Sequence, residues 1–177
     1  MENDQTSSVT TRSVGIRYGI IMGIISIAFF VIMMVAGVDM SGPARWASLI
    51  YTAIIFFLAH KYFKENGDGY MTIGQGTGIG FWASLIASVI SSLFTFVYVK
   101  FIDQSFIQQI LDKQREAFEE AGNMSEDQID AALEMSAKFT TPEMMLVFGL
   151  IGGVIMGVIC AVIVSLFTQK KNPEAFV

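Results

Sequence analysis

Four long apolar stretches are the feature that most limits what this chain can fold into. They run over residues 14–35, 44–63, 79–99 and 144–167. An α-helix rises about 1.5 Å per residue, so each stretch of about 20 residues can cross a hydrocarbon layer of about 30 Å. The stretches are continuous and do not alternate apolar with polar residues, which favours helical spans over the strands of a membrane barrel. We therefore predict an all-α membrane protein with four transmembrane helices.

Composition and the first span agree with this class. Charged residues make up 15% of the chain, below the roughly 25% of soluble domains. The first span is too long for the apolar core of a signal peptide and has no basic cluster before it. Residues 1–13 are interpreted as a polar cytoplasmic tail, and residues 14–177 as a single transmembrane domain. Cys160 is the single cysteine, which excludes an intramolecular disulfide, and we expect it to be apolar filler.

The distribution of Lys and Arg predicts the orientation of the spans. If the spans alternate, the N-terminus, the loop at 63–78 and the C-terminus share one side. Near the span ends that side has six basic residues and the other has three, namely Arg12, Arg17, Lys61, Lys64, Lys170 and Lys171 against Arg45, Lys100 and Lys138. Cytoplasmic loops carry the excess of Lys and Arg, so we expect both termini in the cytoplasm and the third loop outside.

The third loop is long enough to form an amphipathic helical hairpin at about residues 100–141. Residues 101–121 lack Gly and Pro, which favours a helix that continues from the third span. Gly122 and Asn123 tolerate the left-handed conformation that ends helices, and Ser125 with Gln128 is typical of a capping box that starts a second helix. Each helix has a stripe at spacings of three and four, made of Phe106, Ile107, Ile110, Leu111, Gln114 and Phe118, then of Ile129, Ala132, Leu133, Ser136 and Phe139.

The hairpin is strongly acidic. Residues 102–143 carry 10 acidic and 3 basic side chains, a net charge of 3 − 10 = −7. One interpretation is a surface that docks a partner protein through Glu116, Glu119, Glu120, Asp127 and Asp130. The other is a solvated acidic face whose apolar side packs on its own bundle. Adsorption to anionic lipid is disfavoured, because such binding usually uses Lys and Arg.

Glycines four residues apart form two strips. Gly15, Gly19 and Gly23 lie in the first span, and a second strip in the fourth span consists of Gly149, Gly153 and Gly157. Small residues at this spacing let two helix backbones approach closely. We expect the first and fourth spans to pack tightly through these strips. The alternative is that one strip faces outward and mediates a homodimer.

Hydroxyl side chains form a polar face on the third span. Ser84, Ser88, Ser91 or Ser92, and Thr95 recur at spacings of three and four. Such a face can line a solute pathway. Its hydroxyls can equally bond the carbonyl of residue i−4 or bond across a helix interface.

No catalytic, cofactor or metal signature accompanies the spans. The glycine run at 74–80 lacks the preceding strand and the Lys-Ser or Lys-Thr pair of a phosphate loop, so it indicates a flexible or re-entrant entry with close packing. The acidic loop lacks calcium-hand spacing, and the one histidine, His60, is expected on the opposite side. Asp103 is a lone carboxylate at the membrane border, which is little evidence for an acid catalyst or a metal ligand. We expect no enzyme activity, cofactor, metal or nucleic-acid partner.

Several short motifs occur in an order that resembles a known family. They lie at 69–75 before the third span, at 98–103 at its exit, at 141–142 before the last span and at 170–173 after it. With four spans and an acidic segment, this order resembles the bacterial family called domain of unknown function 4199, over nearly the whole chain. In that family a proline follows the exit aspartate, whereas Gln104 follows Asp103 here, which predicts a helix that runs on without interruption. The resemblance implies a bacterial cytoplasmic-membrane protein and no assigned activity.

Two functional hypotheses follow. The first is a non-enzymatic accessory protein in the lipid bilayer that presents the acidic hairpin to a partner, with a homodimer or a membrane-protein partner as the candidate assemblies. The alternative is a small-solute or lipid-handling transporter that uses the serine-lined face of the third span.

Overall fold

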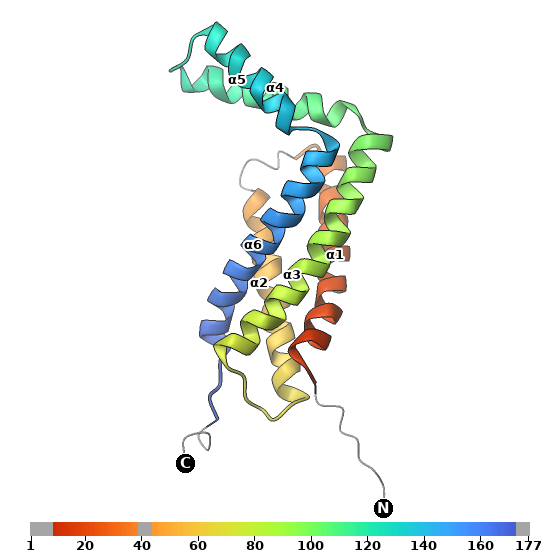
Figure 1. Ribbon diagram of the computed structural model, residues 1–177, viewed down its shortest axis with the longest axis vertical. Helices are drawn as coiled ribbons and strands as arrows, with labels where there is room; N and C mark the ends of the chain where they lie inside the picture. The colour runs from red at the N-terminus through yellow and green to blue at the C-terminus, as the bar shows by residue number, and fades with distance from the viewer. Residues whose placement is uncertain (1–8, 39–43, 173–177) are drawn as a thin grey trace, which may run out of the picture. The chain divides into compact units, whose positions relative to one another are not determined.

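A computed structural model describes residues 9–38 and 44–172, and these residues are helical for most of their length (Figure 1). The elements are α1 (Thr11–Val35), α2 (Ala44–Glu65), α3 (Ile73–Val97), the π-helical turn η1 (Tyr98–Ile102), α4 (Ser105–Ala121), α5 (Glu126–Phe139) and α6 (Pro142–Thr168). Residues 1–8 of the predicted tail, 39–43 of the first turn and 173–177 lie outside the described residues.

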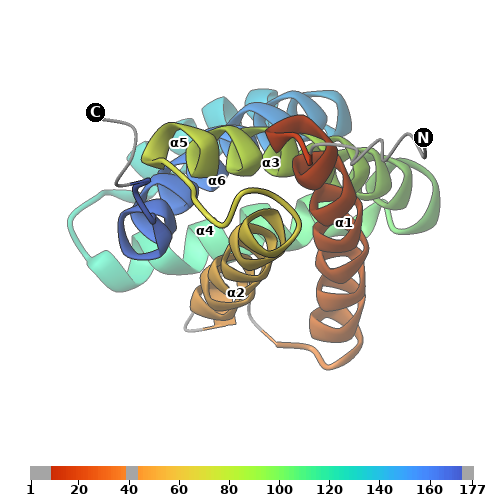
Figure 2. The same cartoon turned by 90° about the horizontal axis from the view of Figure 1, so that it is seen from below.

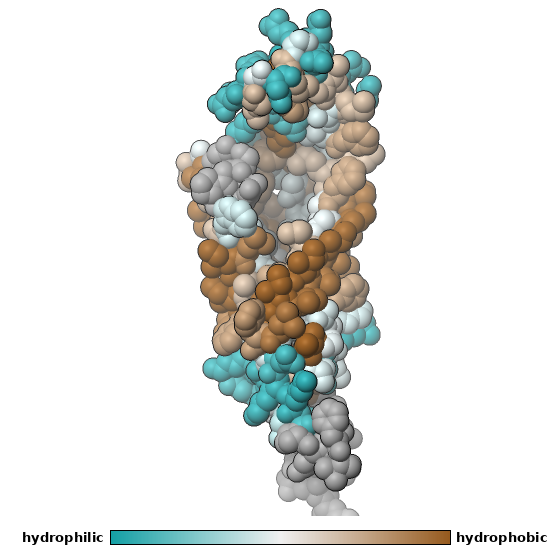
Figure 3. Space-filling model, turned by 90° about the vertical axis from the view of Figure 1, so that its left-hand side faces the viewer, coloured by the Kyte–Doolittle hydropathy of each residue, from teal (hydrophilic) through white to brown (hydrophobic). Residues whose placement is uncertain are grey.

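Among the described residues, four segments are long and apolar enough to cross a membrane, namely Thr11–Val35, Trp46–Glu65, Ile73–Ile102 and Pro142–Thr168. They expose large apolar side chains, such as Ile32 and Ile50, each 63% exposed. Figure 3 shows hydrophobic residues, in brown, over much of one face of the bundle. Exposed apolar surface on this scale is expected of a protein whose solvent is lipid. The predicted class, an all-α multi-pass membrane protein with a helical hairpin between the third and fourth spans, is confirmed.

The chain divides into two compact units. The bundle unit contains the residues up to Ser91 and those from Ile151 onward, and so includes α1, α2, most of α3 and most of α6. The hairpin unit runs from Ser92 to Leu150 and includes the end of α3, η1, α4, α5 and the start of α6. Figure 2 shows the helices of the bundle from below.

The third span begins at Ile73, earlier than the predicted residue 79. The reason is a capping box, in which Gln75 Oε1 accepts from the Thr72 N–H at 2.8 Å and Thr72 Oγ1 accepts from the Gln75 N–H at 3.2 Å. The glycine run at 74–80 is therefore helical, and the prediction of a flexible or re-entrant entry is wrong.

The junction after α3 also differs from the prediction. The helix does not run on: it widens into η1, and Asp103 leaves helical geometry at φ −133° and ψ 88°. The Asp103 carboxylate then accepts hydrogen bonds from the Ser105 N–H at 3.0 Å and the Ser105 hydroxyl at 2.6 Å, which starts α4. An aspartate that bonds the backbone two residues on makes a turn, so the chain turns here with Gln104, and no proline, after Asp103.

The hairpin forms as predicted. Gly122 adopts the left-handed conformation at φ 64° and ends α4, and Ser125 with Gln128 forms the capping box of α5. Figure 1 shows α4 and α5 side by side. Ile129, 3% exposed, is the buried residue of α5. A charged contact joins the two helices, because Arg115 donates to the Asp130 carboxylate at 2.5 Å.

Both glycine strips pack on α3. A methyl group added at Gly15, Gly19 or Gly23 of α1 would lie within 2.5 to 2.9 Å of an atom of Trp82, Ala83 or Ile90 respectively. The prediction that the strip of α1 packs on the strip of the fourth span is therefore wrong. Spacing within one helix reveals a flat strip but not the helix that covers it.

The strip of α6 forms a continuous antiparallel zipper with α3. Each step advances four residues on α3 and goes back four on α6, and each pair joins a glycine to a small side chain. The pairs are Gly76 with Ser165, Gly80 with Ala161, Ser84 with Gly157, Ser88 with Gly153 and Ser92 with Gly149. Because one partner of every pair lacks a side chain, the two backbones can approach closely along the whole contact.

Candidate functional site

The hydroxyl face of α3 is divided between helix packing and a cavity. Ser84, Ser88 and Ser92 are 1%, 6% and 6% exposed and lie against the glycines of α6. The Ser84 hydroxyl is buried without a hydrogen-bond partner in the described part of the chain. Thr95 is half-buried, and Ser91 lies beside the cavity. Along much of its length, the predicted polar face is therefore a packing surface.

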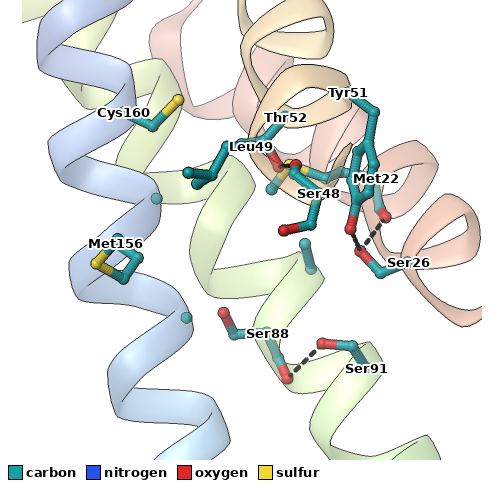
Figure 4. Close-up of a pocket in the computed structure, with 13 residues that line it drawn as sticks. Met22, Ser26, Ser48, Leu49, Tyr51, Thr52, Ser88, Ser91, Met156 and Cys160 are labelled. Atoms are coloured by element: carbon teal, nitrogen blue, oxygen red, sulfur yellow. Dashed lines mark hydrogen bonds between the residues drawn. The ribbon is translucent and has the colours of Figure 1, made fainter. Parts of the chain in front are cut away.

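The cavity has a volume of about 180 Å³ and lies in the bundle unit (Figure 4). All four spans line it, with Met22 from α1, Leu49 from α2, Ala87 from α3 and Met156 from α6 among its apolar walls. Its hydroxyl groups also come from several helices, namely Ser26, Ser48, Tyr51, Thr52, Ser88 and Ser91. Only the two on α3 are predicted from the sequence above, although Ser48, Tyr51 and Thr52 share the same spacing of three and four on α2.

Most of these hydroxyl protons are already used within the protein. Ser26 donates to the Met22 carbonyl at 2.8 Å, Thr52 to the Ser48 carbonyl at 2.7 Å, and Ser91 to the Ser88 carbonyl at 3.4 Å. The Ser26 and Tyr51 oxygens lie 3.1 Å apart. Ser26 has one proton, so when it donates to the Met22 carbonyl it accepts from the Tyr51 hydroxyl. The oxygens of these hydroxyls therefore remain as hydrogen-bond acceptors.

A second polar cluster joins three helices at the end of the bundle where α1 begins and α6 ends, which we call the terminal end. His60 of α2 is fully buried, with Nδ1 at 2.8 Å from Thr168 Oγ1 and Nε2 at 3.1 Å from the Gly76 carbonyl. A carbonyl only accepts, so Nε2 carries a proton and donates to Gly76. His60 thus ties α2 to both α3 and α6. We expected this histidine on the side opposite the acidic loop, but its partners were not foreseen.

Backbone contacts close the same end. Met71, which is fully buried, and Lys170 exchange a pair of hydrogen bonds, each 2.9 Å long, between the start of α3 and the end of α6. Lys64 donates to the Thr168 carbonyl at 2.8 Å. The motifs at 69–75 and 170–172, on which the family resemblance rests, therefore meet in space.

Basic side chains at the terminal end stack on aromatic rings. The guanidinium carbon of Arg12 lies 5.0 Å from the centre of the Trp82 ring, and that of Arg17 lies 4.6 Å from the centre of the Tyr62 ring. Cations over aromatic faces, with the aromatic residues near the span ends, are typical of a membrane–water border.

The candidate docking residues lie on the surface of the hairpin. Glu116, Glu119, Glu120, Asp127 and Asp130 are all exposed. Asp130 pairs with Arg115, and this hydrogen bond raises the pKa of the arginine. Glu119 lies 3.9 Å from the same guanidinium. The two side chains Met135 and Phe139 of α5 are also exposed, at 61% and 52%. The surface of the hairpin unit thus combines acidic and apolar groups.

The remaining candidates have structural partners. The Asp103 carboxylate accepts the two hydrogen bonds from Ser105 at the start of α4, as described above. No group of three or more His, Cys, Asp or Glu side chains is placed to hold a metal ion within residues 9–38 and 44–172. Cys160 is half-buried beside the cavity.

Comparison with known proteins identifies a family. The family model described as "Protein of unknown function (DUF4199)" matches residues 17–170. Neither the curated proteins nor the solved structures contain a match to the chain. The matched residues include the first span from Arg17 onward, the second and third spans, the hairpin and the fourth span, and they contain His60, Met71 and Lys170 of the terminal end.

Proposed function

The chain belongs to the DUF4199 family, and from that premise we propose that it is a non-enzymatic accessory protein of the membrane that docks a partner protein through its acidic hairpin. The observation that carries the proposal is the surface of the hairpin. The five candidate acidic side chains of α4 and α5 are exposed there, and the two helices contact each other through Arg115 and Asp130. A partner with a basic surface and an apolar patch would complement it.

The geometry of the hairpin supports this role. Arg115 is engaged by Asp130 on the neighbouring helix, and Lys138 lies 3.4 Å from Glu134 on its own helix. Both basic side chains are paired with acids of the hairpin unit itself. The excess of acidic side chains in this unit therefore remains available to a basic group of a partner. Exposed Met135 and Phe139 add apolar area that a partner would bury.

The proposal places the protein in the bacterial cytoplasmic membrane with both termini in the cytoplasm. Arg12, Arg17, Lys64 and Lys170 belong to the terminal end, and an excess of Lys and Arg marks the cytoplasmic side. The hairpin would then stand outside, where a periplasmic or membrane partner can reach it.

The alternative, a transporter that uses the serine face of α3, has less support. Ser84 and Ser92 face glycines of α6, which leaves no room for a solute on that part of the face. A transporter coupled to ions also usually has charged groups near the middle of its spans.

The test is purification from native membranes in nanodiscs, with quantitative mass spectrometry of everything that co-purifies. In the test variant Glu116, Glu119 and Glu120 become Gln, and Asp127 and Asp130 become Asn. Neutral residues are preferable to Lys, because added Lys can alter membrane topology. We expect one stoichiometric protein in the wild type and its loss in the variant.

The matched control neutralises exposed acids elsewhere, as Glu65→Gln with Asp68→Asn. It should retain the partner. A partner that stays with the hairpin variant, or the absence of any stoichiometric protein from the wild type, would contradict the docking function.

A further inference from the structure

We propose that the cavity between α1, α2, α3 and α6 binds a small uncharged molecule rich in hydrogen-bond donors, of the glycerol or polyol class. This inference goes beyond the docking function, because none of its steps involves the hairpin. It rests on the size of the cavity, the hydrogen-bonding state of its hydroxyls and the absence of charge from its walls.

The volume of the cavity is large enough for a small polar molecule. A volume of about 180 Å³ equals roughly six water molecules at about 30 Å³ each. A polar cavity of this size holds water when it has enough hydrogen-bonding partners. Glycerol, a small molecule with a hydroxyl on every carbon, can replace that water.

The hydrogen bonds that the cavity hydroxyls already make favour a ligand that donates hydrogen bonds. The protons of Ser26, Tyr51 and Thr52 are directed at other protein atoms, at distances of 2.7 to 3.1 Å. Their oxygens retain lone pairs, since a hydroxyl oxygen can accept two hydrogen bonds. Ser91 has the same arrangement with a longer bond. A ligand that only accepts would find few donors here, whereas a polyol can donate to several helices at once.

The absence of charged side chains from the walls disfavours ions as ligands of the cavity. Among the described residues, no acidic or basic side chain lines the cavity. An anion would face oxygen lone pairs, and a cation would lose its hydration without a counter-charge. Uncharged ligands avoid both costs.

The ligand can arrive from two sources. Met156, one of the wall residues, is 51% exposed, so this wall borders the lipid-facing surface of the bundle. The polyol can therefore be a free solute or the head group of a neutral lipid such as a monoacylglycerol. Both present the same donors to the same oxygens.

Cys160 provides a built-in reporter for the test. It is the single cysteine of the chain and lies beside the cavity. In nanodiscs, its rate of modification by methyl methanethiosulfonate, a small uncharged reagent, is measured with added glycerol or monooleoylglycerol. We expect one or both to slow the reaction, and which of them does so identifies the source. The ether 1,2,3-trimethoxypropane, which has the same frame without donors, should not protect.

Variants of matched shape test the hydroxyls. Tyr51→Phe with Thr52→Val removes two acceptors and keeps the side-chain volumes nearly unchanged. The half-protecting concentration should rise roughly 25-fold, at roughly five-fold per lost hydrogen bond. Thr95→Val, a hydroxyl of α3 outside the cavity, should leave protection unchanged.

Three results would overturn the proposal. Equal protection by trimethoxypropane would make the cavity an apolar site, and protection by potassium or sodium chloride would make it a cation site. Failure of both polyols to protect would mean that the cavity holds water alone. Equilibrium binding of radiolabelled glycerol and monooleoylglycerol to the same nanodiscs decides the question if the thiol reacts too slowly, because the absence of binding by both refutes the site directly.

Discussion

The zipper between α3 and α6 leads to a quantitative prediction for Gly157→Ala. The added methyl carbon would lie 2.6 Å from Ser84 Cβ, whereas ordinary contacts begin at 3.4 Å, so the helices must separate locally by about 0.8 Å. Overpacking of this kind costs about 1–3 kcal/mol. The substitution also gains about 1 kcal/mol of helix propensity, which would mask part of that cost.

Gly152→Ala is the matched control. It lies on the same helix, and a methyl group there meets nothing within 4 Å. It should gain the same propensity without the packing cost, so the two alanine variants should differ in free energy of unfolding by about 1–3 kcal/mol. Unfolding by increasing mole fractions of sodium dodecyl sulfate in maltoside micelles, followed by far-ultraviolet circular dichroism, measures this difference.

A compensating substitution makes the prediction sharper. Combining Gly157→Ala with Ser84→Gly moves the glycine to α3, which reproduces the arrangement that already exists at Gly80 and Ala161. The double variant should be at least as stable as the wild type, since it also removes a buried hydroxyl without a partner. A Gly157→Ala protein as stable as Gly152→Ala, or a double variant less stable than Gly157→Ala, would refute the zipper.

Three further predictions test other parts of the structure. His60→Leu removes the link from α2 to Gly76 and Thr168, so the same unfolding assay should show a loss of about 1–3 kcal/mol; an unchanged stability would exclude a structural role for this cluster. Met71→Ala empties a fully buried position, and its loss of about 2–5 kcal/mol would be contradicted by an unshifted midpoint. Ser125→Ala removes the cap of α5, at a cost of about 1 kcal/mol, and amide exchange should accelerate in the first turn of α5 but not at the start of α1.

Local chemistry made much of the fold predictable. Continuous apolar runs located the spans, and Ser125 with Gln128 located the start of α5 correctly, because a capping box is formed within four neighbouring residues. A similar pair, Thr72 with Gln75, would have predicted the true start of α3. The glycine run concealed it, since glycine weakens helices in isolation.

Pairing between helices was harder to predict. The strips of α1 and α6 were recognised as packing surfaces, but spacing does not specify a partner. One signal was present: the serines at 84, 88 and 92 have the same four-residue period as the glycines at 157, 153 and 149, which is the complement that an antiparallel contact requires. The cavity had a partial signal, because Ser48, Tyr51 and Thr52 lie at spacings of three and four on α2. Ser26 of α1 has no such pattern, and spacing does not show that these hydroxyls and those of α3 line one cavity.

The contacts that close the terminal end have a consequence for biosynthesis. A ribosome makes the first three spans well before Thr168 and Lys170, so His60 and Met71 are made before their partners at the end of α6 exist. Until the last span is inserted, Nδ1 of His60 lacks the Thr168 hydroxyl as its partner, and the Met71 N–H lacks the Lys170 carbonyl as its acceptor. Insertion of α6 therefore both completes the topology and supplies the hydrogen-bond partners of these groups.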